Sequence, residues 1–191
     1  AAVLCVWHPR NAGNEGIAKL LLGEVSPSGR LPMSFPRSVG QMPLSYDYIK
    51  ATLPVGAPNS DFTLRYTDVP NTAFYPFGYG LSYTEFKYSD IEASGDTLTP
   101  ADTLNFAVNV KNVGNFDADE VVQLYIRDDA ASMVARPVRQ LKAFKRVHVK
   151  KGETARVEFI VNEEMLKFYN ADLEYVSEEG SFTVFIGADS T

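Results

Sequence analysis

The strongest constraint on the fold is a two-residue alternation of apolar and polar side chains in the second half of the chain. Residues 104–110 carry an apolar side chain at every second position, and so do residues 155–161. This period places all the apolar side chains on one face of a strand, whereas a helix would scatter them around its surface. The two segments therefore predict β-strands with one buried face and one exposed face.

Further strands are expected within residues 122–126, 141–149 and 182–186, with turn residues between them. About seven short strands over roughly 105 residues are typical of an antiparallel β-sandwich of immunoglobulin or fibronectin-III type. Residues 163–168 predict one short helical turn between the sheets. We therefore expect a mainly β fold, with this sandwich over residues 86–191.

The first residues follow a different pattern. Residues 1–7 are almost continuously apolar, which is typical of a parallel strand buried on both faces. Such a strand needs neighbours, so we expect it to belong to a domain whose larger part lies upstream of Ala1. On this interpretation Cys5 is a small buried residue and not a reactive thiol.

A short buried helix is expected to follow over residues 17–22. Asn14 is a suitable N-cap, Glu15 would place a negative charge in the first turn, and Gly23 would end the helix. Residues 31–36 must be extended, because alternate prolines exclude a helix. The beginning of the chain thus predicts a strand and a helix of an α/β unit.

Residues 37–85, here called the strap, combine many Pro, Gly, Tyr and Asn residues without a sustained period. The segment contains too many aromatic residues for a disordered linker, so we expect it to lie along a surface between two domains. Its rings have two interpretations. They could pack against the sandwich, burying about 150–250 Å² each, or stack on sugars. The interleaved prolines fix a path and favour packing.

Composition excludes several classes of partner. The chain has 18 Lys and Arg against 24 Asp and Glu, a net charge of −6, and no basic patch, which disfavours nucleic-acid binding. No apolar run approaches the roughly 20 residues that cross a bilayer, so no membrane contact is expected. A single Cys gives neither an internal disulfide nor a cysteine-based metal site.

Acidic residues are the first candidates for catalysis or metal binding. Glu15 is the best catalytic candidate, although a structural charge in the helix is the preferred interpretation. Asp47, Asp61 and Asp68 lie in the strap and are expected to bind backbone groups. A further acidic group does not match the spacing of a calcium loop, so these side chains are expected in solvated loops of the sandwich: Asp117, Asp119, Asp128 and Asp129.

The other candidates also favour structural roles. His8 and His148 are far apart, and a lone His is more often hydrogen-bonded than a metal ligand. Residues 78–80 lack the strand and helix of a phosphate loop and predict a tight turn that positions aromatic rings. Ser28 and Ser82 lack the His and Asp partners of a serine hydrolase.

Several long motifs in a fixed order point to a known family. The clearest is Tyr75-Pro76-Phe77-Gly78-Tyr79-Gly80, and others lie within residues 6–36, 120–125, 136–144 and 180–187. The sequence resembles the C-terminal region of glycoside hydrolase family 3. The resemblance covers essentially the whole chain and is strongest to bacterial periplasmic β-glucosidases that end in a fibronectin type III-like domain.

The resemblance implies a division into three parts. Residues 1–36 would end an α/β sandwich domain, 37–85 would form the strap, and 86–191 would form the fibronectin-like domain. Retaining glycosidases need two carboxylates. The family's nucleophilic Asp and acid/base Glu would both lie upstream of Ala1, and a Glu that relatives carry just after the strand corresponds to Ala12. The chain is therefore expected to hold no catalytic, cofactor-binding or metal-binding residue and to brace the catalytic domains.

The resemblance also implies partners and a location. The partners would be the upstream (β/α)₈ barrel and α/β sandwich domains, with a β-glucoside as substrate of the whole periplasmic or secreted enzyme. The chain by itself could also self-associate through residues 1–7. The alternative is a stand-alone fibronectin-III-like module that binds carbohydrate or another partner. Residues 1–36 argue against that module, which has no use for a lone strand and helix.

Overall fold

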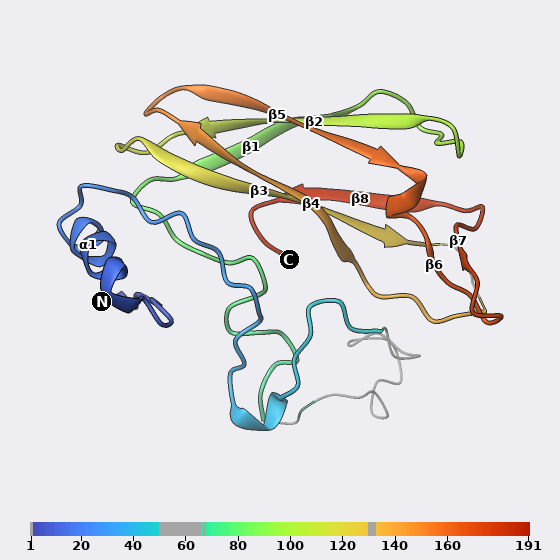
Figure 1. Cartoon of the computed structure of the whole chain (residues 1–191), viewed down its shortest axis with the longest axis horizontal. Coiled ribbons are helices and arrows are strands. Elements are labelled where there is room, and N and C mark those ends of the chain that lie inside the picture. Colours follow the sequence, from blue (N-terminus) through green and yellow to red (C-terminus); the bar gives the residue numbers. More distant parts are fainter. Residues whose placement is uncertain (1, 50–65, 67, 130–132) are drawn as a thin grey trace.

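The computed structural model describes residues 2–49, 66, 68–129 and 133–191. Within these residues, two three-stranded antiparallel sheets pack face to face as a sandwich (Figure 1). The first sheet has the order β1–β2–β5, formed by Phe86–Ala93, Thr103–Asn112 and Thr154–Asn162. The second has the order β4–β3–β8, formed by Gln140–Val149, Ala118–Asp128 and Phe182–Gly187. A small ribbon pairs β6, Phe168–Tyr169, with β7, Tyr175–Val176.

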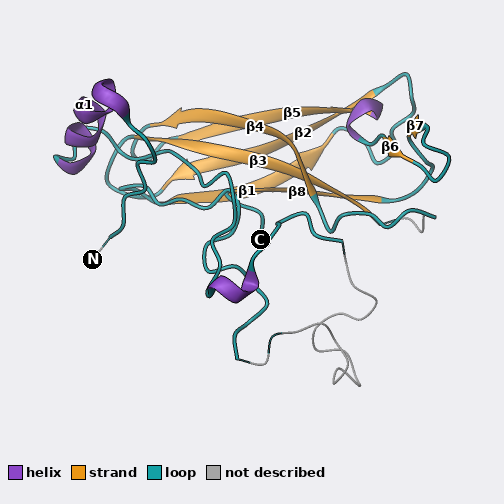
Figure 2. Cartoon of the chain, turned by 60° about the horizontal axis from the view of Figure 1, so that its bottom comes forward, coloured by secondary structure: helices purple, strands orange, loops and turns teal. Residues whose placement is uncertain are grey.

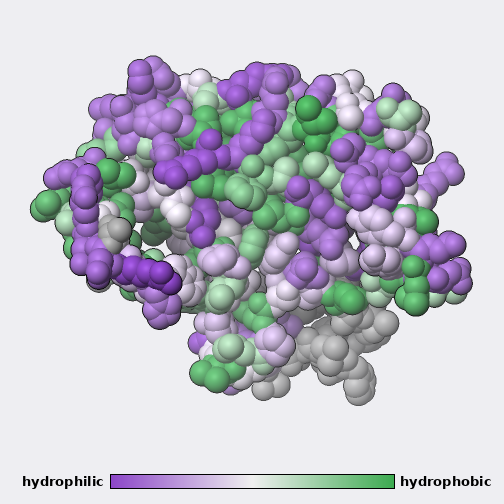
Figure 3. Space-filling view, viewed as in Figure 1, coloured by the Kyte–Doolittle hydropathy of each residue, from purple (hydrophilic) through white to green (hydrophobic). Residues whose placement is uncertain are grey.

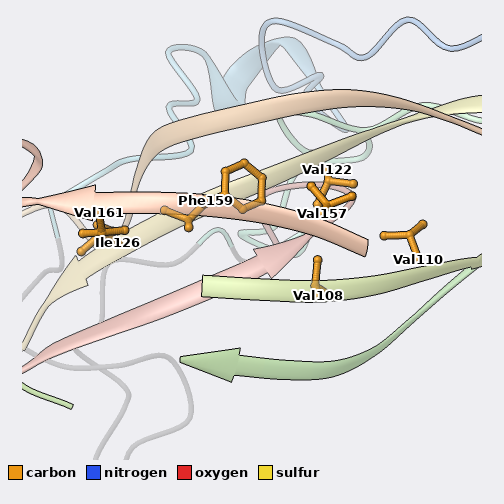
Figure 4. Packing of buried hydrophobic residues seen from close by; sticks show 8 residues of the cluster. Val108, Val110, Val122, Ile126, Val157, Phe159 and Val161 are labelled. Carbon is orange, nitrogen blue, oxygen red and sulfur yellow. The ribbon is translucent and has the colours of Figure 1, made fainter. Parts of the chain in front are cut away.

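The core lies between the two sheets (Figure 4). Alternate residues of β2, β3 and β5 point into it, and a fully buried side chain of this kind contributes about 1.5–3 kcal/mol. The predicted alternation and the mainly β sandwich are therefore confirmed. The cluster consists of Val108, Val110, Val122, Leu124, Ile126, Val157, Phe159 and Val161.

The predicted helical turn after β5 is also confirmed. It is a 3₁₀ turn over Glu163–Met165, and the side chain of Asn162 caps it by accepting a hydrogen bond from the backbone N–H of Met165. The turn leads the chain from one sheet toward the β6–β7 ribbon.

In its described residues the strap is largely irregular and contains a 3₁₀ turn over Val39–Gln41, as Figure 2 shows. Gln41 is almost fully buried. Its Oε1 accepts hydrogen bonds from the backbone N–H groups of Arg37 (2.6 Å) and Ser38 (3.2 Å), and its Nε2 donates to the carbonyl of Pro70 (2.8 Å). One glutamine side chain therefore joins two parts of the strap that are about thirty residues apart.

Residues 2–7 differ from expectation. They form no strand with any described residue, and their side chains are exposed, with Val3 at 93% and Cys5 also open. Within the described residues the segment is therefore neither paired nor buried, and Cys5 is exposed, so the strand expected to have its neighbours upstream of Ala1 stays a prediction. A parallel strand requires hydrogen-bonding neighbours on both edges, and the described residues provide none. Trp7 does reach the segment before the strap, with its ring edge-on to Phe35 at 6.4 Å.

The helix α1 spans Arg10–Leu21, and its N-cap lies five residues before the predicted one. Pro9, not Asn14, is the N-cap, because its fixed φ of −71° suits the start of a helix. Glu15 therefore lies mid-helix, where it pairs with Lys19 at 2.6 Å, and not in the first turn. The predicted end at Gly23 is confirmed by its φ of +75°.

Apolar side chains remain exposed at the end of α1 (Figure 3). Leu21 and Leu22 are 72% and 74% exposed, so the prediction of a buried helix is wrong at these positions. The helix is held to the strap by a hydrogen bond from the Tyr83 hydroxyl to the carbonyl of Leu20 (2.6 Å). Among the described residues, no helix is long and apolar enough to span a membrane.

Candidate functional site at the strap–sandwich interface

Residues 31–35, which precede the strap, and residues 75–79 of the strap run side by side below the β4–β3–β8 sheet in Figure 1. Backbone hydrogen bonds join Leu31 N–H to the carbonyl of Tyr79 (2.9 Å) and Gly78 N–H to that of Leu31 (2.8 Å). Phe35 N–H donates to the carbonyl of Tyr75 (2.8 Å). Residues 31–35 and 75–79 are therefore held together as one unit.

Aromatic rings fix this unit to the sandwich. The Tyr46 ring stacks on Phe77 with centroids 4.2 Å apart and meets Tyr125 of β3 edge-to-face at 6.0 Å. Tyr125 is 1% exposed. Tyr79 stacks on Tyr75 at 5.0 Å, as expected for a turn that positions rings. For these strap rings the packing interpretation is the one that the geometry supports.

Gln123 of β3 is the polar centre of the interface. Its Nε2 donates to the carbonyls of Gly78 (3.2 Å) and Ala188, and its Oε1 accepts from the Tyr125 hydroxyl (2.5 Å). The side chain is buried, so each of these bonds satisfies a group that would otherwise be costly to bury. Gln123 thereby ties the strap, β3 and the segment after β8 together.

The turn at Gly78 requires glycine for two reasons. Its φ is +81°, and a Cβ at this position would collide with the Gln123 carboxamide. We expect Gly78→Ala to lower the free energy of unfolding by about 2–4 kcal/mol through strain and overpacking. Gly152→Ala is the matched control, because Gly152 has a φ of +79° but open space around it. Urea unfolding that gives equal losses for both variants would refute the collision.

A buried ion pair lies at the end of the sandwich. Arg30 bonds to one carboxylate oxygen of Glu120 in β3, and the Tyr88 hydroxyl of β1 donates to the other (2.7 Å). The side chains of Arg30 and Glu120 are 9% and 2% exposed. Burial raises the pKa of Glu120, and the Arg30 charge and the Tyr88 hydrogen bond oppose that rise. One carboxylate thus joins both sheets to the segment that precedes the strap.

The acidic side chains predicted in solvated loops have partners, and two of them lie within β3. Asp119 binds Arg146 and His148, and Asp128 binds Arg136 at 3.2 Å. The predicted position in a loop is therefore wrong for Asp119 and Asp128, which lie within β3. The pairing of β3 with β4 brings basic side chains beside Asp119, and Arg136 reaches Asp128 from the segment before β4. His148 is hydrogen-bonded, as expected.

The two remaining acids of this group also have partners. Asp117 accepts from the backbone N–H of Lys151 (2.8 Å), and Asp129 pairs with Arg127 (2.5 Å). In the described part of the chain, no three His, Cys, Asp or Glu side chains gather in a way that could hold a metal ion.

Asp119 gives the pairing of β3 with β4 a pH dependence. Burial alone would raise its pKa, but hydrogen bonds from His148 and Arg146 outweigh it and hold the pKa below the ordinary value of 3.8. A lowered pKa in the folded state stabilises the fold above pH 3.8, and this contribution is lost as the pH falls through the folded-state pKa. We expect Asp119→Asn to cost less than about 1 kcal/mol at pH 7 and progressively less as the pH falls below 3.8 in urea unfolding. A loss that grows with acidification would contradict this.

The other acidic candidates are dispersed over the fold. Glu15 is exposed on α1 and paired with Lys19. Asp47 accepts a hydrogen bond from the Ser45 hydroxyl and not from the backbone group that was expected, and Asp68 is exposed. Asp61 lies outside the described residues. The structure brings none of the three described acids together.

The remaining candidates are also separate. His8 is exposed near the start of the chain, and His148 lies far from it in the sequence, in β4. The Ser82 hydroxyl donates to the carbonyl of Thr84 (2.7 Å), and Ser28 lies in the segment that leads to Arg30. Their positions give no nucleophile–base pair.

Comparison with known proteins identifies the family. A model described as "Glycosyl hydrolase family 3 C-terminal domain" matches residues 1–83, and one described as "Fibronectin type III-like domain" matches residues 120–190. The chain thus carries the C-terminal domain of glycosyl hydrolase family 3. Its match to the family's C-terminal domain and to a fibronectin-like domain confirms the resemblance seen in the sequence motifs.

Relatives in this family are longer than the chain. A protein named "Periplasmic beta-glucosidase" from Salmonella typhimurium is 44% identical over 99% of the chain and 25% of its own length. A "Putative beta-xylosidase" from Formosa agariphila is 41% identical over 99% of the chain and 24% of its own length. The crystal structure of a β-glucosidase from Listeria innocua in complex with gluconolactone has a TM-score of 0.84 and 40% identity, covering 94% of this chain and 25% of its own. The chain thus spans about a quarter of these relatives.

Three important residues of this family 3 segment were missed by sequence reasoning: Arg30, Glu120 and Gln123. A signal for Gln123 was present, because residues 121–126 are apolar at nearly every position, which is typical of a strand covered on both faces. The prediction from alternating apolar residues placed one face of that strand in solvent. The pairing of Arg30 with Glu120 spans 90 positions and leaves no local pattern.

Proposed function

We propose that this chain is the C-terminal region of a retaining β-glucosidase that hydrolyses terminal β-D-glucosyl residues. The observation that carries the proposal is the similarity over nearly the whole chain to named β-glucosidases at 44% and 40% identity. Because β-xylosidases are among the relatives, the preference of the whole enzyme for glucosides over xylosides has to be tested. The chain's own part is structural: it contributes the end of an α/β domain at residues 1–36, the strap at 37–85 and the sandwich at 86–191.

Bracing is the role that the interface supports. The strap is joined to the sandwich by the Tyr46–Phe77–Tyr125 rings and by Gln123, so residues on either side of it are held as one unit. The exposed apolar residues of the N-terminal segment and α1 form a surface suited to packing against further residues of the same polypeptide. This joined arrangement favours the enzyme segment over a stand-alone module.

The catalytic carboxylates are proposed to lie outside residues 1–191. A retaining mechanism needs two carboxyl groups about 5–5.5 Å apart, one of them a nucleophile. In the described part of the chain, the acids considered above are dispersed over separate elements, and several are paired with basic side chains, as Glu15 and Asp128 are. A periplasmic or secreted location is proposed from the relative named periplasmic.

The proposal is tested by assaying an aryl β-D-glucoside and the matching β-D-xyloside with two proteins. The product of the complete gene is expected to release the aryl group from the glucoside faster than from the xyloside. The purified 191-residue chain is expected to show no turnover above buffer. Turnover by that chain that Glu15→Gln abolishes, or an inactive complete product, would refute the proposal.

A further inference from the structure

A groove runs beside the strap on the outer face of β3 and β4. Its volume is about 340 Å³. The segment before the strap and the strap itself form one wall, and the two strands form the other. The apolar lining consists of Leu31, Pro32, Phe77, Val121, Leu141 and Phe144.

Phe144 is the most unusual lining residue. It lies opposite Gln123 in the β3–β4 register, yet Gln123 is 3% exposed and Phe144 is 65% exposed. The strap covers one member of the pair and leaves the other open. In the described part of the chain, Phe144 takes part in no ring–ring or cation–ring contact. Strand β4 therefore presents the exposed ring of Phe144 to the groove.

The charges of the groove are balanced. Arg146 lines it and pairs with Asp119 at 2.6 Å, and Arg30 lines it and pairs with Glu120. The Arg146 side chain is still 62% exposed, so part of its guanidinium can donate to a ligand. Paired charges beside an apolar ring suit a neutral ligand with hydroxyl groups better than an anion.

We propose that this groove is a non-catalytic binding site for a neutral sugar. The apolar face of a pyranose would stack on Phe144, and its hydroxyl groups would accept from Arg146 and bond to Ser28, which also lines the groove. Ligand pockets range over roughly 300–1,000 Å³, so a groove of about 340 Å³ suits one or two sugar rings. The inference goes beyond the proposed function and does not depend on it, because it concerns only described residues of this chain.

The test is a titration of the ¹⁵N-labelled 191-residue chain with cellobiose, followed by its amide NMR spectrum, which also reports whether each variant is folded. We expect saturable shifts at Gly29, Gly78 and Phe144, with a Kd of the order of 1 mM. Phe144→Ala should weaken binding at least tenfold, and Phe144→Tyr should retain it. Ile160→Ala is the matched control, since Ile160 is 58% exposed on a strand of the other sheet.

Three results would overturn the proposal. The first is the absence of saturable shifts at the groove in a folded sample. The second is binding that survives Phe144→Ala. The third comes from a parallel titration with glucose 6-phosphate and glucose: if the phosphate binds more than tenfold tighter, the groove selects anions. Equal activity of the complete gene product and its Phe144→Ala variant on an aryl glucoside is expected, so this proposal and the enzymatic one can fail separately.

Discussion

Replacing Glu120 with Leu is expected to lower the free energy of unfolding by about 3–5 kcal/mol, because Arg30 would remain buried without a counter-charge. Both side chains are almost fully enclosed, so solvent cannot compensate for the lost partner. The Tyr88 hydroxyl would lose its acceptor as well. Urea unfolding at pH 7 measures this loss.

The neighbouring residue supplies the control for this experiment. Asp119 precedes Glu120 on β3, and its partner Arg146 is 62% exposed, so Asp119→Leu should cost less than about 1 kcal/mol. The double variant Arg30→Met with Glu120→Leu should recover most of the loss, since it removes the unpaired buried charge. Equal losses at positions 119 and 120 would show that Glu120 is not an essential partner of Arg30.

Replacing Tyr125 with Ala is expected to cost about 3–5 kcal/mol and to loosen the strap. The ring is 1% exposed, meets Tyr46 edge-to-face, and donates its hydroxyl to Gln123. Its removal leaves a cavity between the strap and β3 and also frees a buried amide oxygen. Thermal unfolding and the rate of proteolytic cleavage within the strap measure the two effects.

Phe144→Ala is the matched control for Tyr125→Ala. Phe144 lies on the same outer face one strand away, but its ring is largely open to solvent, so the variant should cost less than about 1 kcal/mol. Phe77→Ala should fall between the two, because Phe77 is half-buried and stacks on Tyr46. If all three variants melt alike, the rings do not hold the strap to the sandwich.

The sequence was most informative where a local period determines the structure. Val108 and Val157 are buried as their alternation predicted, since neighbouring residues on a strand point to opposite faces. It was less informative where distant segments meet. Tyr125 would face solvent in a bare sandwich, and it is buried because the strap covers the outer face of its sheet.

The beginning of the chain shows the same limit. An apolar run such as Val3–Val6 indicates what a segment prefers to bury, but burial also needs neighbouring strands, which the described residues do not supply. The start of α1 was misplaced for a different reason. Asn14 is the better N-cap by residue type, yet Pro9 already favours helical φ, and the helix begins there.

The pairing of β3 with β8 has a consequence for how the polypeptide is made. Arg127 pairs with Thr183 across 56 positions, whereas β3 and β4 form a nearer hairpin. At translation rates of about 5–20 residues per second, β3 would wait roughly 3–11 seconds for its second neighbour. During that interval an apolar strand has one open edge, which is the condition under which nascent chains attract chaperones or each other. Slowing translation between residues 128 and 182 should therefore increase the aggregated fraction before it affects the stability of the finished molecule.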